Sequence, residues 1–558
     1  MNRAPDSILI GGRVLTFDDA SSVCEAIALT EDRIAAVGTD RDVVALAGPQ
    51  TNVIQLRGRT VIPGIVDAHA HMEREGLKAL RLSLAGLRSV REILERIGME
   101  AMRRPKGEWI VTMPVGEPPY FFDGPGTLVE RRMPDRHELD RAAPDHPVCI
   151  SGVFGNWGRP PGYTALNTLA LQLNSIGRDT KPACEGVTIE RDASGEPTGI
   201  IVERNNRPTV EFDLLRAVPK FSAADRLAAL RVSMRTYNAV GTTSIYEGHG
   251  SSPETIACYR QLAEEGALTV RTALTVSPTW SDMAEAERDM RDWLPYARGR
   301  GFGDEWLRVC GLFIGFGDDP AVAKITRAAL PDTGWTGFVE SANSPDEYRA
   351  YARLAAHHDL RVHTIVGDRL AEILPILEDV DRTHPLARRR WVLEHVGRIR
   401  AQDIAVLKRL GIGITTIPVY QLWKNADRYL GDADAGESAV PHRMLLDAGI
   451  PLAAGTDNIP YNPFFTVWAM AARTERTSGR VIGPGQRLAA GEGLRLLTRN
   501  GPWFSFEEAR KGTLEAGKLG DLAVLSDDPR DVPVDEIASI SAVLTMAGGR
   551  VVHHVPWE

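Results

Sequence analysis

The chain has 558 residues, 43% of them hydrophobic and 25% charged, and its formal net charge is -9 at pH 7. This composition is typical of a globular protein with a large core, and the acidic balance argues against a nucleic-acid-binding surface. No signal peptide, membrane span or C-x-x-C pair stands out, so we expect a cytoplasmic protein.

Both ends of the chain read as short strands separated by turn residues. Near the N-terminus such runs lie at 7–10, 13–17, 26–29, 33–37 and 52–56, and near the C-terminus at 520–525, 542–546 and 550–554. Gly or Asp residues follow most of these runs, as in β-hairpins. The N-terminal set is too thin to bury a core of its own. We therefore predict that residues 1–62 and 506–558 pair into one β-sandwich.

The motif that ends at His71 organises the centre of the chain. The apolar run 61–66 is broken by Pro63-Gly64 and is followed by His69 and His71. Residues two apart on a strand project from the same face, so the two imidazoles would point together. Neutral imidazole is a common zinc ligand, and the motif reads as half of a metal site. The alternative is two unrelated surface histidines.

Strands and helices alternate through the predicted large domain, 63–505. We predict helices at 89–103, 222–239, 344–359, 401–410, 440–448, 463–477 and 489–498. The predicted strands are 61–66, 148–150, 241–247, 307–313, 360–363, 391–395, 413–417 and 451–457. This alternation favours a (β/α)8 barrel, an α/β fold of the TIM type. Residues 104–215 are rich in Pro and Gly and read as a long insertion across the barrel mouth.

Potential metal ligands follow four of these strands. His69 and His71 follow the first, and His363, His395 and Asp457 end later ones. Chemistry in such barrels sits at the C-terminal strand ends. Each residue alone has another reading, such as a hydrogen-bonded core histidine for His363 or a helix cap for Asp457. Together they predict a divalent metal site.

Several motifs resemble those of the amidohydrolase superfamily, and the amidohydrolase-3 (YtcJ-like) group in particular. They are VIPGIVDAHAH at 61–71, VHTIVGD at 362–368, LEH at 393–395, GTD at 455–457, and flanking stretches at 194–203, 512–521 and 548–552. The resemblance covers nearly the whole chain. It implies a metal-dependent hydrolase built from a barrel and a β-sandwich.

The resemblance also implies roles for the strand-end residues. A divalent ion, zinc by expectation, lowers the pKa of its water to about 7 and polarises a carbonyl. Asp457 would take the proton of that water and pass it to the leaving nitrogen. His69, His71, His363 and Asp457 would hold the ion. His395 would either bind a second ion or form a hydrogen bond with the attacking water.

One departure from the family favours a single ion. Many members carry a metal-bridging Lys at the end of the fourth strand, whereas residues 309–318 contain none. A second ion could still be held by Glu247 and His249, at the end of the predicted third strand, together with His395. The alternative is a solvated loop around Gly248.

A second departure concerns the substrate. Relatives often show an Asp-Gly-His element near the second strand, where this chain has FGNWGRPPGY at 154–163. Candidate substrate contacts are Trp157, Arg159 and Tyr163 in this stretch, and Tyr420, Trp423 and Lys424 after the seventh strand. Aromatic residues at a barrel mouth suit an apolar or aromatic substrate. Ordinary loop packing is the other reading.

We therefore expect hydrolysis of an amide or related C–N bond in a small molecule, with neither nucleic acid nor membrane as partner. Ring deamination, ester cleavage or C–C cleavage on the same site is the alternative reaction. A non-catalytic relative that uses the barrel for binding is the alternative class. The sequence leaves the substrate, the identity of the metal and the existence of a homo-oligomer open.

Overall fold

The computed structural model describes residues 3–152, 159–205, 208–317, 320–329, 343–431 and 433–557. The chain divides into two compact units. The first unit comprises Met1–Met72, Leu230–Gly317 and Phe338–Glu558, and the second comprises Glu73–Ala229 and Asp318–Gly337. The predicted insertion, 104–215, lies inside the second unit, which begins before it and ends after it.

The first unit contains the predicted barrel. Its eight parallel strands are, in order around the sheet, β8 (Ile65–Asp67), β14 (Thr242–Ser251), β15 (Arg271–Val276), β17 (Leu307–Phe313), β18 (Val362–Ile365), β19 (Val392–Glu394), β20 (Gly413–Thr416) and β21 (Leu452–Ala454). Short β16 (Phe302–Gly303) pairs with β17. Backbone hydrogen bonds from Ala68 to Ala454 (3.4 Å) and from Asp457 to His69 (2.9 Å) link the first strand to the eighth.

Two strand predictions were wrong. Residues 148–150 form β10, which pairs with β9 (Ile110–Thr112) and β11 (Gly162–Leu166) in the second unit rather than with the barrel. The prediction missed β15, because its threonines and Arg271 hide the apolar pattern of a buried strand. In the fold these polar groups are buried, and Thr275 donates to the Glu247 carbonyl at 2.9 Å. As a result β14, predicted as the third barrel strand, is the second.

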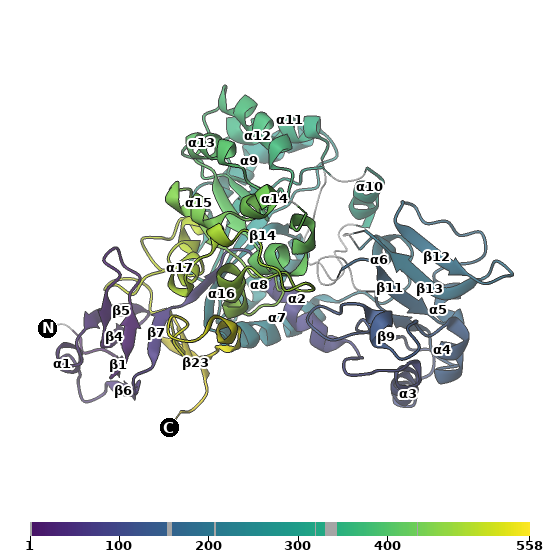
Figure 1. Ribbon diagram of the computed structural model, residues 1–558, viewed down its shortest axis with the longest axis horizontal. Helices are drawn as coiled ribbons and strands as arrows, with labels where there is room; N and C mark the ends of the chain where they lie inside the picture. The colour runs from purple at the N-terminus through teal and green to yellow at the C-terminus, as the bar shows by residue number, and fades with distance from the viewer. Residues whose placement is uncertain are drawn as a thin grey trace. The chain divides into compact units, whose positions relative to one another are not determined.

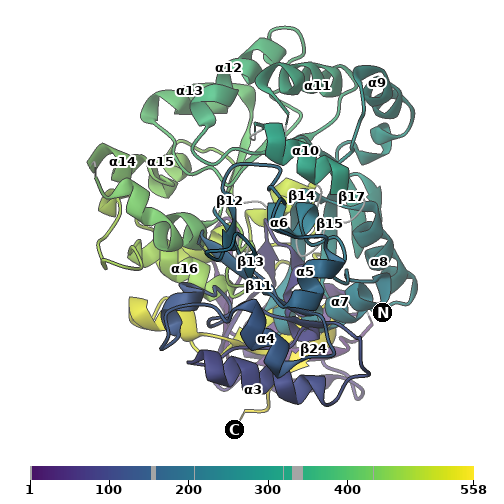
Figure 2. The ribbon, with the colours of Figure 1, turned by 90° about the vertical axis from the view of Figure 1, so that its right-hand side faces the viewer.

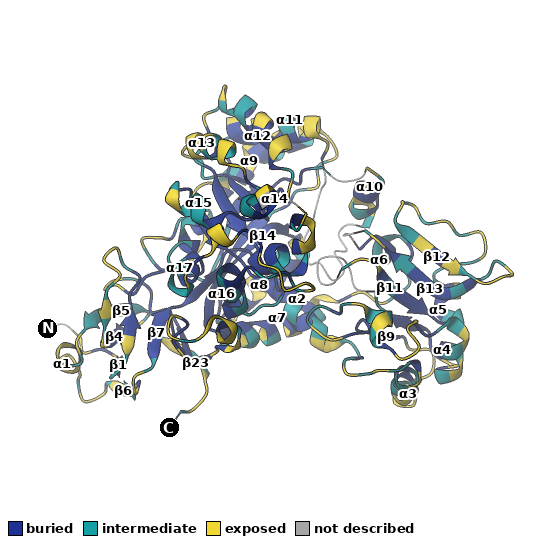
Figure 3. Cartoon of the chain, viewed as in Figure 1, coloured by how far each residue is buried: buried dark blue, intermediate teal, exposed yellow. Residues whose placement is uncertain are grey.

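Helices cover the outside of the barrel (Figure 1 and Figure 2). In the first unit they are α8 (Pro253–Glu264), α9 (Met283–Asp292), α11 (Pro345–His357), α12 (Leu370–Asp381), α13 (Ala401–Leu410), α14 (Ala433–Ser438), α15 (His442–Asp447), α16 (Pro463–Ala472) and α17 (Ala490–Leu496). The short helix α1 (Asp40–Val44) instead packs on the N-terminal strands of the β-sandwich. The Ser344 hydroxyl caps α11 by accepting a hydrogen bond from the Glu347 N–H, and the Glu347 carboxylate accepts one from the Ser344 N–H. This confirms the predicted capping box. Figure 3 shows buried strands inside and exposed faces on the outer helices.

Both ends of the chain build the β-sandwich, as predicted. One sheet has the order β5-β4-β1-β6 and the other has the order β24-β23-β22-β7-β2-β3. The strands are β1 (Ser7–Ile10), β2 (Arg13–Leu15), β3 (Val23–Cys24), β4 (Ala26–Thr30), β5 (Arg33–Gly38), β6 (Asn52–Gln55), β7 (Thr60–Pro63), β22 (Leu522–Leu525), β23 (Ala542–Ala547) and β24 (Arg550–His554). C-terminal β22 pairs with N-terminal β7, and one apolar cluster joins Leu9, Val61 and Leu522.

A glycine separates the sandwich from the barrel. The apolar run 61–66 becomes two strands, β7 in the sandwich and β8 in the barrel, with Gly64 between them. A Cβ at Gly64 would lie 2.1 Å from the Thr243 hydroxyl oxygen. The close approach to β14 therefore requires a residue without a side chain, and it fixes where the chain leaves one sheet and enters the other.

The second unit is a five-stranded sheet with helices of its own. Its order is β12-β13-β11-β10-β9, where β12 is Val187–Arg191 and β13 is Pro197–Glu203. Its helices are α3 (Val90–Ala101), α4 (Arg136–Ala142), α5 (Thr168–Leu173), α6 (Thr209–Asp213) and α10 (Pro320–Ala329), while α2 (Met72–Leu77) and α7 (Ala223–Asn238) span the boundary between units. Within the described ranges, the structure contains no helix with the length and apolar character to cross a membrane.

Candidate metal centre

Four histidines and one aspartate meet at the C-terminal ends of the barrel strands. They are His69 and His71 after β8, His249 on β14, His395 after β19 and Asp457 after β21. They form two overlapping groups, His69-His249-His395 and His69-His71-Asp457, and within each group the ligand atoms lie within 4.8 Å of one another. Residues separated by up to 388 positions in the chain therefore share one small volume.

The backbone positions these side chains. His69 and His71 point to the same side, and the intervening Ala70 donates its N–H to the Tyr246 carbonyl at 2.9 Å. His395 and Asp457 have positive φ angles of 52° and 53°, a conformation that is uncommon for residues with side chains. His395 directly follows β19, and Asp457 follows β21 after Gly455 and Thr456. The left-handed turn at each position redirects the side chain toward the barrel axis.

The ring nitrogens converge closely. His69 Nε2 lies 2.9 Å from His395 Nε2, and His71 Nε2 lies 2.6 Å from His249 Nδ1. The Asp457 carboxylate lies 3.2 Å from His71 Nε2. Four imidazoles and a carboxylate form a nitrogen-rich donor set that suits a divalent transition metal such as zinc. Burial removes the water that would otherwise satisfy their lone pairs, so the donor set fits a cation.

Glu247 supports His71 from behind. One carboxylate oxygen of Glu247 lies 3.2 Å from His71 Nδ1. The other accepts from the Tyr259 hydroxyl at 2.9 Å and from the Met72 N–H at 3.0 Å. One oxygen therefore faces the Nδ1 side of His71, and the other is engaged by groups outside the cluster. A carboxylate on one ring nitrogen of a histidine fixes which nitrogen remains available to a metal.

A parallel arrangement lies behind His69. Glu394 is fully buried and places one carboxylate oxygen 3.2 Å from His69 Nδ1 and the other 2.8 Å from His363 Nδ1. His363 Nε2 lies 2.6 Å from the Tyr246 hydroxyl. Burial lowers the pKa of His363 to about 4, so its ring is neutral at pH 7.

Asp67 connects the first and eighth strands behind the cluster. Its carboxylate accepts from the Thr456 N–H at 2.9 Å, from the Thr456 hydroxyl at 2.5 Å and from the His69 N–H at 3.2 Å. Burial raises the pKa of this carboxyl to about 7. Sequence reasoning gave Asp67 no role, although an aspartate two residues before the first ligand-type histidine was a visible signal.

The structure brings together most of the predicted ligand residues. His69, His71, His395 and Asp457 meet as expected, and His249 joins them. His363 and Glu247 are in neither ligand group, because their polar atoms contact Tyr246, Glu394, Tyr259 and the His71 ring. The fourth strand, β17, has Gly311 beside the His363 ring, because a Cβ there would lie 2.9 Å from that ring.

The residues proposed to contact substrate separate into three sets. Tyr420, Trp423 and Lys424 lie on a π-helical turn, Val419–Lys424, that follows β20 in the first unit. The Tyr420 ring lies 5.9 Å from the His395 ring, and the buried Lys424 ammonium lies 5.0 Å from the Tyr420 ring. The Trp423 ring instead packs edge-on against Phe465 at 5.3 Å.

The remaining substrate candidates are not part of the first unit. Arg159 and Tyr163 belong to the second unit, where Tyr163 is on β11 beside its apolar core. Trp157 lies outside the described residues. We expected the stretch 154–163 to lie near the second barrel strand in sequence. It does not, because the second barrel strand is β14. A substrate-binding role for these three residues stays a prediction.

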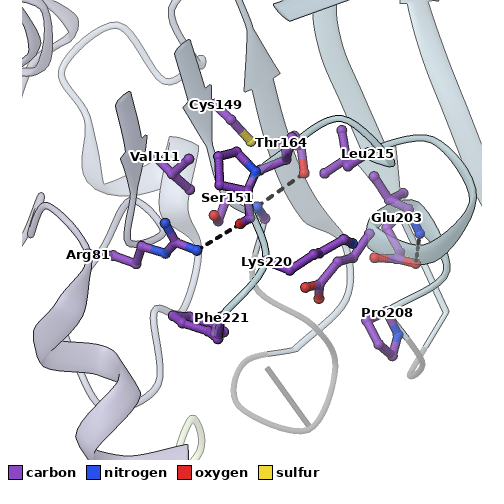
Figure 4. Close-up of a pocket in the computed structure, with 15 residues that line it drawn as sticks. Arg81, Val111, Cys149, Ser151, Thr164, Glu203, Pro208, Leu215, Lys220 and Phe221 are labelled. Atoms are coloured by element: carbon purple, nitrogen blue, oxygen red, sulfur yellow. Dashed lines mark hydrogen bonds between the residues drawn. The ribbon is translucent and has the colours of Figure 1, made fainter. Parts of the chain in front are cut away.

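The second unit contains a separate cavity of about 50 Å³ (Figure 4). Its lining combines the charged side chains of Arg81, Glu203 and Lys220 with Cys149, Thr164 and Phe221. Arg81 donates to the Pro219 carbonyl at 2.9 Å and lies over the Phe221 ring. Among the described residues, neither group of candidate metal ligands lies at this cavity.

Comparison with known proteins gives consistent matches over the whole chain. The amidohydrolase family model matches residues 52–553. N-substituted formamide deformylase of Arthrobacter pascens is 26% identical over 98% of both chains. Putative amidohydrolase YtcJ of Bacillus subtilis is 25% identical over 97% of this chain and 98% of its own. The crystal structure of an uncharacterised metal-dependent hydrolase from Pyrococcus furiosus shares the fold, with a TM-score of 0.67, 19% identity, and coverage of 94% and 100% of the two chains.

Proposed function

This chain belongs to the amidohydrolase family, and we propose that it hydrolyses a C–N bond of a small molecule with the help of one divalent metal ion, zinc by preference. The observation that carries this proposal is the convergence of His69, His71 and Asp457, joined by His249 and His395, on one buried point. Such an ion lowers the pKa of a water molecule to about 7 and polarises a carbonyl group.

We assign the ligand role to His69, His71, His249 and Asp457. These four residues are at most 3% exposed, so their ring and carboxylate atoms are shielded from competing water. His395 differs, because 11% of its side chain is exposed and its Nε2 lies 3.8 Å from Asp457. It is therefore the histidine placed to donate a hydrogen bond to the substrate or to the attacking water.

Asp457 is proposed to move the proton. One of its oxygens faces His71 and the other faces His395, so it sits between the ligand side and the more open side of the cluster. A carboxylate in this position accepts a proton from water and delivers it to the leaving nitrogen. Breaking a C–N bond requires that delivery, since an amine anion is a poor leaving group.

The rings of Phe313 and Tyr420 favour an apolar group on the substrate. Phe313 lies 5.8 Å from the His249 ring, edge to face, and Tyr420 lies beside His395. Aromatic residues next to polar groups are typical of sites for small apolar ligands. The name of the Arthrobacter pascens relative makes N-substituted formamides the first substrates to test.

The test combines Asp457→Asn with a substrate panel. We expect metal-loaded wild type to release amine from an amide in the panel, and Asp457→Asn to reduce turnover about 10²–10⁴-fold, the range for loss of a general base. Asp289→Asn, on outer helix α9, is the matched control and should retain activity. Turnover by the metal-free protein, or by Asp457→Asn at the wild-type rate, would contradict the proposal.

The same panel separates the alternative reactions. Ammonia release from cyclic amidines would indicate a deaminase, and alcohol release from esters would indicate an esterase. Binding of panel compounds without any turnover would indicate a non-catalytic relative.

A further inference from the structure

A groove at the surface of the first unit lies between the β2–β3 hairpin and the start of α17. This hairpin groove has a volume of about 590 Å³, and its lining comes from the stretches 15–23, 487–495 and 529–537 together with Ala471. Sites for small molecules typically have volumes of about 300–1,000 Å³. None of the candidate metal ligands found among the described residues lines the groove, so it is separate from the metal centre.

Apolar side chains form most of the lining. Val23 and Val534 are 56% and 45% exposed, whereas Leu15, Phe17 and Leu488 are buried. Exposed apolar groups beside a buried apolar floor leave hydrocarbon surface in contact with water, which is unfavourable. Such a concave apolar surface marks a binding site more often than a scattered exposed valine does. The groove therefore suits the apolar body of a ligand.

Two of the charged residues in the lining already have partners of opposite charge. Arg530 donates to Asp528 with hydrogen bonds of 3.0 and 2.7 Å. The Glu492 carboxylate accepts from both terminal nitrogens of Arg443, at 2.8 and 2.6 Å. These pairs leave two arginines of the lining to be accounted for.

Arg487 and Arg495 form no ion pair with any residue that the structure describes. Arg495 donates to the Ser21 hydroxyl, and its guanidinium carbon lies 5.7 Å from the centre of the Phe17 ring. Phe17 has a positive φ of 51°, which is uncommon for a residue with a side chain, and its carbonyl accepts from Arg499 at 3.2 Å. The Arg495 guanidinium is thus held beside the apolar floor, where its N–H groups can donate to a carboxylate.

We propose that the hairpin groove binds an apolar carboxylate, whose alkyl or aryl body packs between Val23 and Val534 and whose carboxylate accepts hydrogen bonds from Arg495 and Arg487. The lining calls for both parts of this ligand. A neutral alcohol would not compensate the arginine charges, and a short carboxylate would leave the valines in water. Because the volume of the groove matches one small molecule, a small molecule is its expected occupant rather than a protein segment.

The test is calorimetric titration of the metal-loaded full chain with octanoate, octan-1-ol and acetate. We expect one octanoate per chain, bound more tightly than the alcohol or acetate. Arg495→Gln should raise the octanoate dissociation constant about 10-fold, as for the loss of a hydrogen bond to a charged group. Arg487→Gln should raise it about 2–5-fold, because Arg487 is exposed. Arg480→Gln, at an exposed position outside the groove, is the matched control and should bind octanoate like wild type.

A second pair of variants tests the apolar part of the groove. Val534→Asp places a carboxylate beside the ligand and should weaken octanoate binding more than about 10-fold through like-charge repulsion. Val53→Asp, at a 47% exposed position on β6, should leave octanoate binding unchanged.

Three results would overturn the proposal. The first is a wild type that does not bind octanoate below micelle formation. The second is octanoate affinity that is unchanged when Arg487→Gln and Arg495→Gln are combined, which would place the carboxylate elsewhere, the metal included. The third is a wild-type dimer in sedimentation that Val534→Asp dissociates without weakening octanoate binding, which would make the groove an interface between copies of the chain.

Discussion

Glu203 shows how a single buried carboxyl group makes stability depend on pH. It ends β13 in the second unit, and burial raises its pKa from 4.5 to about 7, although bonds from Thr209 and from the Val210 N–H (3.0 Å) oppose the rise. Between these pH values the unfolded chain is ionised while the folded chain keeps its proton. Stability is therefore fully present below pH 4.5 and is lost as the pH rises to about 7. One pKa unit corresponds to about 1.4 kcal/mol, so the loss is about 3 kcal/mol.

We expect Glu203→Gln to remove this loss, because the amide keeps a hydrogen-bond acceptor and cannot ionise. The measurement is the thermal unfolding midpoint at pH 5 and at pH 8, and the variant should gain on wild type at pH 8. Glu190→Gln, at an exposed position of β12, is the control and should follow wild type. The same decline with pH in Glu203→Gln would show that another group causes it.

Strand-end position revealed part of the metal centre from sequence. His69, His71, His395 and Asp457 each follow an apolar run, and parallel strands deliver such residues to one edge. The sequence does not show which side chains from other strands contact His363 and Glu247. Tyr246 and Glu394 engage His363, and Tyr259 engages Glu247, through contacts between residues that are far apart in the chain. Those contacts engage the polar atoms of His363 and Glu247, and neither residue belongs to a candidate ligand group.

At the scale of one element, β14 contributes through what it lacks as well as through His249. Gly248 leaves the space in which His69 and Glu394 meet, and a methyl group there would lie within 2.6 Å of both. We expect Gly248→Ala to separate the two side chains and weaken Co²⁺ binding more than 10-fold, in line with the loss of a supporting carboxylate. Titration with Co²⁺ measures the affinity, and circular dichroism checks that the fold persists.

The control for this variant is Gly431→Ala, since an added Cβ there would have no atom within 4 Å. If Gly248→Ala binds Co²⁺ with wild-type affinity, the strand adjusts without disturbing His69. The close packing at Gly248 would then not be needed for metal binding.

Whether a barrel strand could be predicted from the sequence depended on the amino-acid composition of that strand. Apolar runs such as 391–393 and 451–454 identified β19 and β21, since strands buried on both faces are apolar throughout. The strand β15 escaped because three of its six residues are polar. Arg271 and the threonines become acceptable in a core only when the fold supplies their partners, and those partners are distant in sequence. The three-residue run 148–150 gave the opposite error, because a run so short does not indicate which sheet it joins.

At the scale of the whole molecule, the pairing of the chain ends was predictable and the extent of the second unit was not. Matching hairpin patterns at both ends pointed to one sandwich, which β7 and β22 form. The second unit begins at Glu73, only two residues after the motif that ends at His71. Helix α3 has the same amphipathic pattern as a barrel helix, and nothing in its sequence states that it packs on a five-stranded sheet instead.

A buried ion pair couples the sandwich to the barrel inside the first unit. Arg271 on β15 and Asp521, just before β22, form two hydrogen bonds of 2.8 and 3.1 Å, with side chains 2% and 5% exposed. Asp521 also accepts from the Gly548 N–H at 2.7 Å, and the guanidinium lies over the Trp306 ring. Removing one partner of such a pair leaves an uncompensated charge and costs about 3–5 kcal/mol.

We therefore expect Asp521→Ala to lower the thermal midpoint of the first unit markedly. The control is Asp531→Ala, which removes an exposed partner of Arg13. It should change the midpoint little, because exposed pairs contribute about 0–1 kcal/mol. Replacing both residues, as Arg271→Met with Asp521→Leu, removes the orphaned charge and should restore much of the loss. Recovery in the double variant would show that the cost of Asp521→Ala is the unpaired guanidinium. If the double variant is no more stable than Asp521→Ala, the hydrogen bond to Gly548 and the stacking on Trp306 are what join the two domains.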